Sequence, residues 1–226
     1  MLTAEDHCIP LDVLAFMAAA IEFQVRRDLA PIYGGPPWSV SAMSSLDGVR
    51  GDANVRKILT FKTKIADANA LAFHTDFMGV EYAESLPPAF DAVSIDATAP
   101  SHEVIETFCD PECTATRPRA SGDLVDYETA DPVEGDSYVI SVTIGTELRA
   151  VSVSNFVYPA WFGEAAGPYD FMGKLDGPWK MTPGGYFRLT DRKGNELYVY
   201  ADNAARARVT TKLANPTSRV ARRDKT

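Results

Sequence analysis

The segment 101–106, Ser-His-Glu-Val-Ile-Glu, carries the side chains of this sequence best suited to metal chemistry. On an α-helix, residues i and i+4 project from the same side, so His102 and Glu106 place an imidazole nitrogen and a carboxylate oxygen where both can bind one cation. Glu103 lies about 100° around the same helix. There it can accept a proton from a metal-bound water, as the glutamate of an H-E-x-x-H zinc peptidase helix does. The spacing predicts a divalent metal site with Glu103 as the catalytic general base.

Glu106 stands where an H-E-x-x-H helix has its second histidine. A carboxylate makes the site harder and more anionic, so zinc is the first expectation, while calcium and manganese stay open. An interpretation of this segment without a metal also stays open. In this alternative, His102 and Glu103 form a polar first turn of the helix, and their negative charge interacts favourably with the helix N-terminus.

A third ligand must come from another segment, because two ligands on one helix cannot complete a tetrahedral site that keeps one position for water. The densest downstream group of acids spans residues 126–136, a loop away from the predicted helix. Glu128 and Asp131 are equally good candidate metal ligands within it. The alternatives for this segment are a solvated acidic turn or a calcium loop.

His74 and the three cysteines are the remaining candidates for chemistry. His74 ends a predicted strand just before the site helix, so it is a second catalytic candidate that can approach the metal or an oxyanion; the alternative is a hydrogen-bonded structural residue. Cys109 continues the stripe of His102 and Glu106, but Pro111 breaks the helix before Cys113, so we expect buried or free thiols. Three cysteines are too few for a disulfide framework.

Hydrophobic periodicity predicts the elements that must position these side chains. The predicted order is helix, strands, helix and then mostly strands, which is typical of an α+β fold with a small mixed sheet rather than of alternating βαβ units. We expect residues 1–136 to form a core, 137–202 a β-rich extension packed on it, and 203–226 a tail. The predicted helices span 11–29 and 98–110, and the predicted strands span 39–43, 57–65, 70–74, 80–83, 138–144, 148–153, 185–189 and 197–200, with a glycine hairpin turn at 191–194.

Composition narrows the class of protein. The 226 residues are 46% hydrophobic and 23% charged, which fits a globular chain and excludes a collagenous or disordered one. No apolar run reaches the roughly 18 residues of a membrane span, and acids near the N-terminus replace the basic residues of a secretion signal, so we expect a cytoplasmic or virion-associated protein.

Charge is divided unevenly along the chain. The net charge is −9, yet residues 203–226 hold seven bases and one acid. The acidic body disfavours specific nucleic-acid recognition. The basic tail is expected to be extended, either solvated or docked on an acidic surface, and dispensable for the fold.

Several of these segments resemble an uncharacterised zincin-like family of phage and bacterial proteins, over roughly residues 20–190. The similar segments are the H-E-x-x-E run at 102–106, the following Asp-Pro at 110–111, the acidic run 128–136, and the stretches 24–31, 70–74 and 153–162. The resemblance implies a zincin-like core made of the N-terminal helix, the small mixed sheet and the active-site helix. Many such genes look like phage virion genes, which implies a second class of function.

Two hypotheses follow. In the first, the protein is a zincin-like metallopeptidase, a hydrolase that acts on a peptide or protein substrate through a metal held by His102, Glu106 and an acid from 128–131. In the second, it is a virion structural or adaptor protein that keeps the scaffold without turnover and attaches to neighbouring virion proteins through its basic tail.

Overall fold

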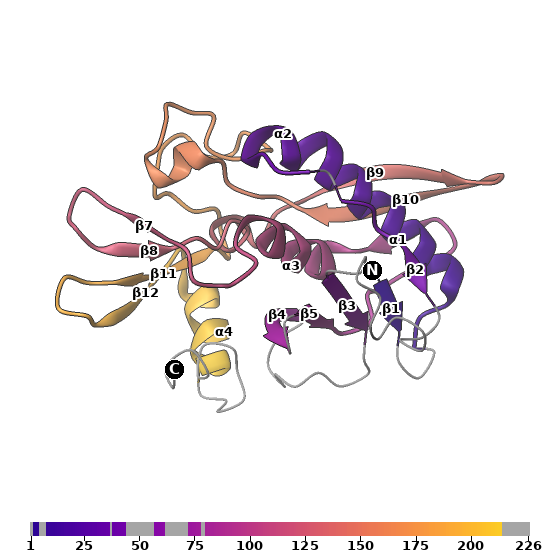
Figure 1. Cartoon of the computed structure of the whole chain (residues 1–226), viewed down its shortest axis with the longest axis horizontal. Coiled ribbons are helices and arrows are strands. Elements are labelled where there is room, and N and C mark those ends of the chain that lie inside the picture. The colour runs from indigo at the N-terminus through magenta and orange to yellow at the C-terminus, as the bar shows by residue number, and fades with distance from the viewer. Residues whose placement is uncertain are drawn as a thin grey trace.

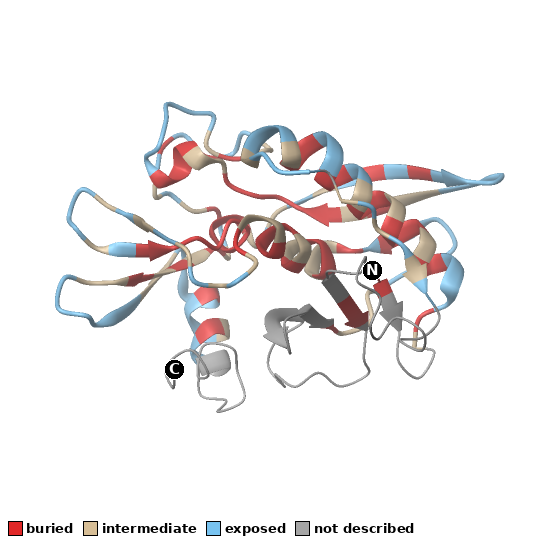
Figure 2. Ribbon diagram, in the orientation of Figure 1, coloured by how far each residue is buried: buried red, intermediate tan, exposed pale blue. Residues whose placement is uncertain are grey.

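The computed structural model of the chain describes residues 2–4, 8–36, 38–43, 57–61, 72–77 and 80–213. Within these residues the fold combines helices with three β-sheets, so the predicted α+β class is confirmed (Figure 1). Two clusters of buried hydrophobic side chains hold it together, and buried residues line the inner side of α1 and much of α3 (Figure 2).

The N-terminal helix forms as predicted and continues further. Helix α1 spans Leu11–Gln24, a π-helical turn spans Val25–Leu29, and α2 spans Ala30–Tyr33. Pro31 lies in the first turn of α2 rather than beyond the helix, and it has no N–H with which to bond the preceding π-helical turn. Helix α1 packs on the first two sheets.

The first sheet has the strand order β2-β1-β3-β5-β4. Strand pairs β1–β2, β1–β3 and β3–β5 are parallel, whereas β4 runs antiparallel to β5 and ends the sheet. The strands predicted at 57–65, 70–74 and 80–83 are therefore present with shifted ends, and β1 is an addition. Their bounds are β1 Leu2–Ala4, β2 Ala42–Met43, β3 Lys57–Phe61, β4 Ala72–Phe77 and β5 Val80–Ser85.

The second sheet supports helix α3, which spans Thr98–Cys109. Strands β9 (Ser137–Ile144) and β10 (Glu147–Ser154) form an antiparallel hairpin, and β6 (Ser94–Asp96) pairs in parallel with β10. The buried Ile95, Ile140 and Val151 lie opposite one another in register and join the hydrophobic cluster of α1 and α3.

The third sheet has the strand order β12-β11-β8-β7. The second hydrophobic cluster packs on it around Trp161, which is fully buried in the short 3-10 helix η4 (Pro159–Phe162). The hairpin turn predicted at 191–194 is confirmed, with Gly194 at a φ of 84°. The strands are β7 Thr116–Pro118, β8 Leu124–Asp126, β11 Tyr186–Thr190 and β12 Glu196–Tyr200.

Strand pairing and packing cross residue 136, where the predicted core ends and the predicted extension begins. Strand β8, before the boundary, pairs with β11, and the β9–β10 hairpin, after it, packs on α1 and α3. The physical reason is that strands pair where their buried faces match, and a single sequence does not show which faces match.

The prediction of an extended tail is wrong for residues 203–213, which form helix α4 (Asn203–Leu213). The carboxylate of Asp202 accepts the Ala205 N–H at 2.8 Å and so caps the helix, and the side chains of Ala205 and Val209 are buried. Residues 214–226 lie outside the described residues. Among the helices that are described, none has the length and apolar character needed to cross a membrane.

Deleting α4 should therefore destabilise the protein. Burial of Ala205 and Val209 and the bonds of Arg208 contribute about 2 kcal/mol, which corresponds to a fall of about 4–8 °C in melting temperature for a chain of this size. The comparison is between a chain ending at Leu213 and one ending at Asp202, so that the difference reports on α4 alone. Equal melting temperatures would show that α4 is not part of the folded unit.

Candidate metal centre

Helix α3 carries His102 and Glu106 and is fixed at both ends. At its start, the Asp96 carboxylate accepts the Thr98 N–H at 3.1 Å, and the Ser101 hydroxyl accepts the Ser154 N–H of β10 at 2.7 Å. At its end, the Asp110 carboxylate accepts the N–H groups of the 114–115 turn. These bonds set the rotation of α3, and with it the side on which His102 and Glu106 lie.

Asp131 lies on a separate element, the 3-10 turn η3 (Asp131–Val133). Pro132 occupies its first turn and favours the helical φ there. Flanking backbone bonds hold the turn, because Val157 donates its N–H to Thr129 O at 2.8 Å and Thr182 donates its N–H to Pro132 O at 3.2 Å.

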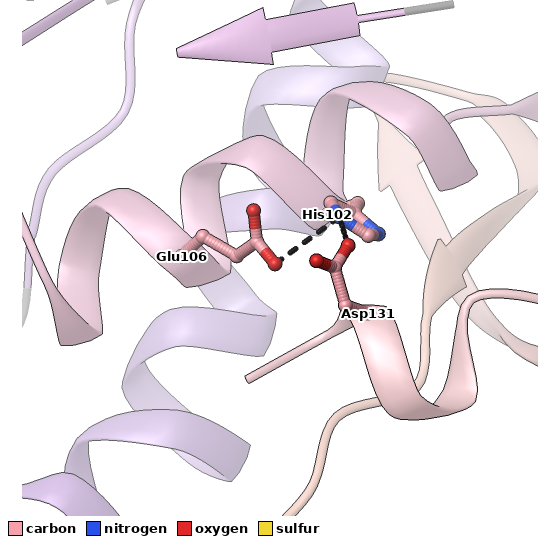
Figure 3. Close-up of side chains that lie close together, drawn as sticks. All are labelled: His102, Glu106 and Asp131. Atoms are coloured by element: carbon pink, nitrogen blue, oxygen red, sulfur yellow. Dashed lines mark ion pairs between the residues drawn. The ribbon is translucent and has the colours of Figure 1, made fainter. Parts of the chain in front are cut away.

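His102, Glu106 and Asp131 point toward one another from these two elements (Figure 3). The His102 Nε2 atom lies 3.3 Å from Glu106 Oε1 and 3.3 Å from Asp131 Oδ1, and one ligand atom from each residue lies within 4.8 Å of the others. Their side chains are 11%, 2% and 11% exposed, respectively. The cluster is therefore nearly enclosed, with its small remaining exposure on His102 and Asp131.

The charges of the cluster alter the pKa of each member. Burial by itself lowers the pKa of His102, but the carboxylates of Glu106 and Asp131 outweigh it and raise that pKa well above 6.5. Burial, together with the negative charges of Asp131 and Glu128, raises the pKa of Glu106 to about 8 although His102 opposes the shift. Burial likewise raises the pKa of Asp131. The metal-free cluster thus holds protons more tightly than the same residues in water.

The donor set fits a divalent metal. Bonds of about 2.1 Å at a tetrahedral zinc place neighbouring ligand atoms about 3.4 Å apart, close to the two 3.3 Å separations of His102 from its partners. One nitrogen and two carboxylate oxygens suit zinc or manganese. The same distances fit a protonated His102 paired with the two carboxylates. A proton on the imidazole and a bound metal are therefore alternative ways to supply the positive charge at this cluster.

The other predicted site residues have different positions. Asp131 contacts His102, and Glu128 is buried and close enough for its charge to act on Glu106 and Asp131. Glu103 is buried, and its charge contributes to raising the pKa of His102. The backbone of His74 lies in β4 opposite Ala83, and its side chain lies outside the described residues.

The three cysteines are free thiols, as predicted. Cys109 lies one turn after Glu106, and burial raises the pKa of its thiol well above the usual range. A protonated thiol is a poor metal ligand. Cys113 lies beyond the end of α3 and has a positive φ of 55°.

Sequence reasoning missed two residues around the cluster, Tyr186 and Arg208. Burial raises the pKa of Tyr186 on β11 well above 10, and the carboxylates of Asp131 and Glu134 add to the shift. Glu134 pairs with Arg208 of α4. No local pattern marks Tyr186 or Arg208, because both reach the site through strand pairing and helix docking that only the tertiary structure defines.

Comparison of the chain with models of known protein families, with curated proteins and with solved structures found no match. The assignment of a function therefore depends on the geometry and charge of the site.

The raised pKa values make the stability of the metal-free protein depend on pH. Between the ordinary value of 4.5 and the folded value of about 8, folded Glu106 keeps a proton that the unfolded chain releases. Stability therefore falls as pH rises through this window, and the raised pKa of His102 acts in the same direction. With a chelator present, the loss of melting temperature from pH 5 to 8.5 should be larger for the wild type than for Glu106→Gln. Equal losses would contradict this account of the cluster.

Proposed function

We propose that this protein is a metal-dependent hydrolase that cleaves peptide bonds. Its one divalent metal, for which zinc is the favoured ion, is held by His102, Glu106 and Asp131. The observation that carries the proposal is the convergence of these three side chains, from α3 and η3, in a nearly enclosed cluster. Three protein ligands leave a position for water, as catalytic zinc sites require.

Glu103 serves as the general base in this proposal. A bound divalent metal supplies a water whose pKa is lowered toward 7. Glu103 is buried one position after His102 on α3, and its charge is felt by that imidazole. Its carboxylate accepts the proton of the attacking water and returns it to the leaving amine.

A peptide substrate is supported by the strand beside the site helix. Strand β4 ends the first sheet within the described residues, runs antiparallel to its neighbour β5, and lies against α3. An edge strand offers backbone N–H and C=O groups with which an extended peptide can pair. Together with α1 and α3, this mixed sheet supports the zincin-like core that the sequence resemblance implies.

The first test is metal content. His102→Ala should abolish binding of zinc, because removal of one of three protein ligands leaves too little coordination energy. Elemental analysis after equilibration with zinc should find about one ion per wild-type chain and close to none in the variant. His7→Ala, which removes another of the three histidines in the sequence, is the matched control. Equal zinc content in all three proteins would reject the metal centre.

The second test separates base from ligand. Glu103→Gln should retain fold and zinc but lower the cleavage rate about 100-fold or more, because the amide cannot accept the proton. Cleavage of a mixture of peptides is followed by mass spectrometry, with the exposed Glu112→Gln as control. Zinc binding without any cleavage by the wild type would reject the hydrolase and leave a metal-stabilised structural protein. Loss of zinc in Glu103→Gln would make Glu103 a ligand.

A further inference from the structure

We infer that helix α4 is a positioning element of the metal centre, and that Arg208 is the residue through which it fixes the turn carrying Asp131. This inference rests on the proposed metal site. Helix α4 begins 105 residues after the start of α3, in a segment that the sequence marks only as basic.

The turn that carries Asp131 is stacked directly on the turn at 182–185. A side-chain carbon at Gly185 would lie 2.1 Å from Pro132 O, and one at Gly135 would lie 2.4 Å from Pro183 O. Only glycine allows backbones to approach this closely. The backbones of the two turns are in direct contact, with no side chain between them, so the position of the 182–185 turn determines the position of η3.

Helix α4 in turn holds the 182–185 turn. One carboxylate, that of Asp202, accepts the Ala205 N–H at the start of α4 through Oδ1 and the Gly184 N–H at 2.7 Å through Oδ2. Gly184 has a φ of 89°, a conformation that favours glycine. The cap of the helix and the anchor of the turn are therefore the same side chain.

Arg208, farther along α4, joins both turns with one nitrogen. Its Nη2 atom donates to Gly184 O at 2.7 Å and to Glu134 Oε2. Glu134 follows η3 directly, and its own N–H bonds to Asp131 O at 3.3 Å. A continuous path of bonds thus runs from α4 through Arg208 and Glu134 to the backbone of the third ligand.

The exposure of this contact indicates a geometric role. The side chains of Arg208 and Glu134 are 36% and 22% exposed, and ion pairs this open to solvent contribute little to global stability. A contact that orients a ligand can still change metal affinity strongly, since loss of groups that orient ligands typically weakens binding by about 10-fold or more. Metal affinity should therefore respond to Arg208 more than melting temperature does.

The test measures affinity for Zn²⁺ by competition with a chromophoric chelator. Arg208→Gln should bind Zn²⁺ about 10-fold more weakly than the wild type, and Arg208→Lys should recover part of the loss because its ammonium can still reach one of the two oxygens. Arg206→Gln is the matched control, because Arg206 lies on the same helix, is exposed, and contacts Tyr200 instead. The visible spectrum of the Co²⁺-loaded protein should change in Arg208→Gln and not in Arg206→Gln.

The outcomes separate this inference from the proposed function. If the wild type binds Zn²⁺ and His102→Ala does not, but Arg208→Gln binds as tightly as the wild type, the positioning role is overturned while the metal site stands. If the wild type binds no Zn²⁺, the proposed function fails first. If Arg208→Gln does not fold, Glu134→Gln and Arg208→Lys replace it, and wild-type affinity in both would overturn the inference.

Discussion

The imidazole of His102, held between two buried carboxylates, is the interaction on which the site depends. Burying Glu106 and Asp131 side by side is costly unless a cation lies between them. His102 satisfies that need when protonated, and a divalent metal satisfies it with two charges instead of one. The cluster is therefore built for a cation whichever one occupies it, and the raised pKa values of all three groups express this in the metal-free protein.

The site lies where the two hydrophobic clusters meet. Ala130, just before Asp131, belongs to the cluster of α1, α3 and the second sheet, whereas Val133, just after it, belongs to the cluster around Trp161. Ile105 secures α3 in the first cluster. Because the three side chains of the site are attached to both hydrophobic clusters, the distances between them are set by how the two clusters pack, not by any single element.

The acidic and basic parts of the chain are also joined at this place. Arg208 of α4 pairs with Glu134 beside the acidic cluster. At least one base of the C-terminal segment thus forms a contact within the fold. The average composition of the tail did not predict that it forms a docked helix, because such a helix needs only a cap and a few buried residues at helical spacing. Asp202 provides the cap, and Ala205 and Val209, four residues apart, provide the buried side.

The sequence by itself determined the local parts of this protein. Helical spacing identified α1 and α3, alternation identified most strands, and the i, i+4 rule placed His102 and Glu106 on one side of a helix, because each depends only on neighbouring residues. Only the tertiary structure brought Asp131 to His102, paired β8 with β11 across residue 136, and brought Arg208 to Glu134. Those contacts join residues far apart in the chain, and they follow from how buried faces fit together, which no local pattern encodes.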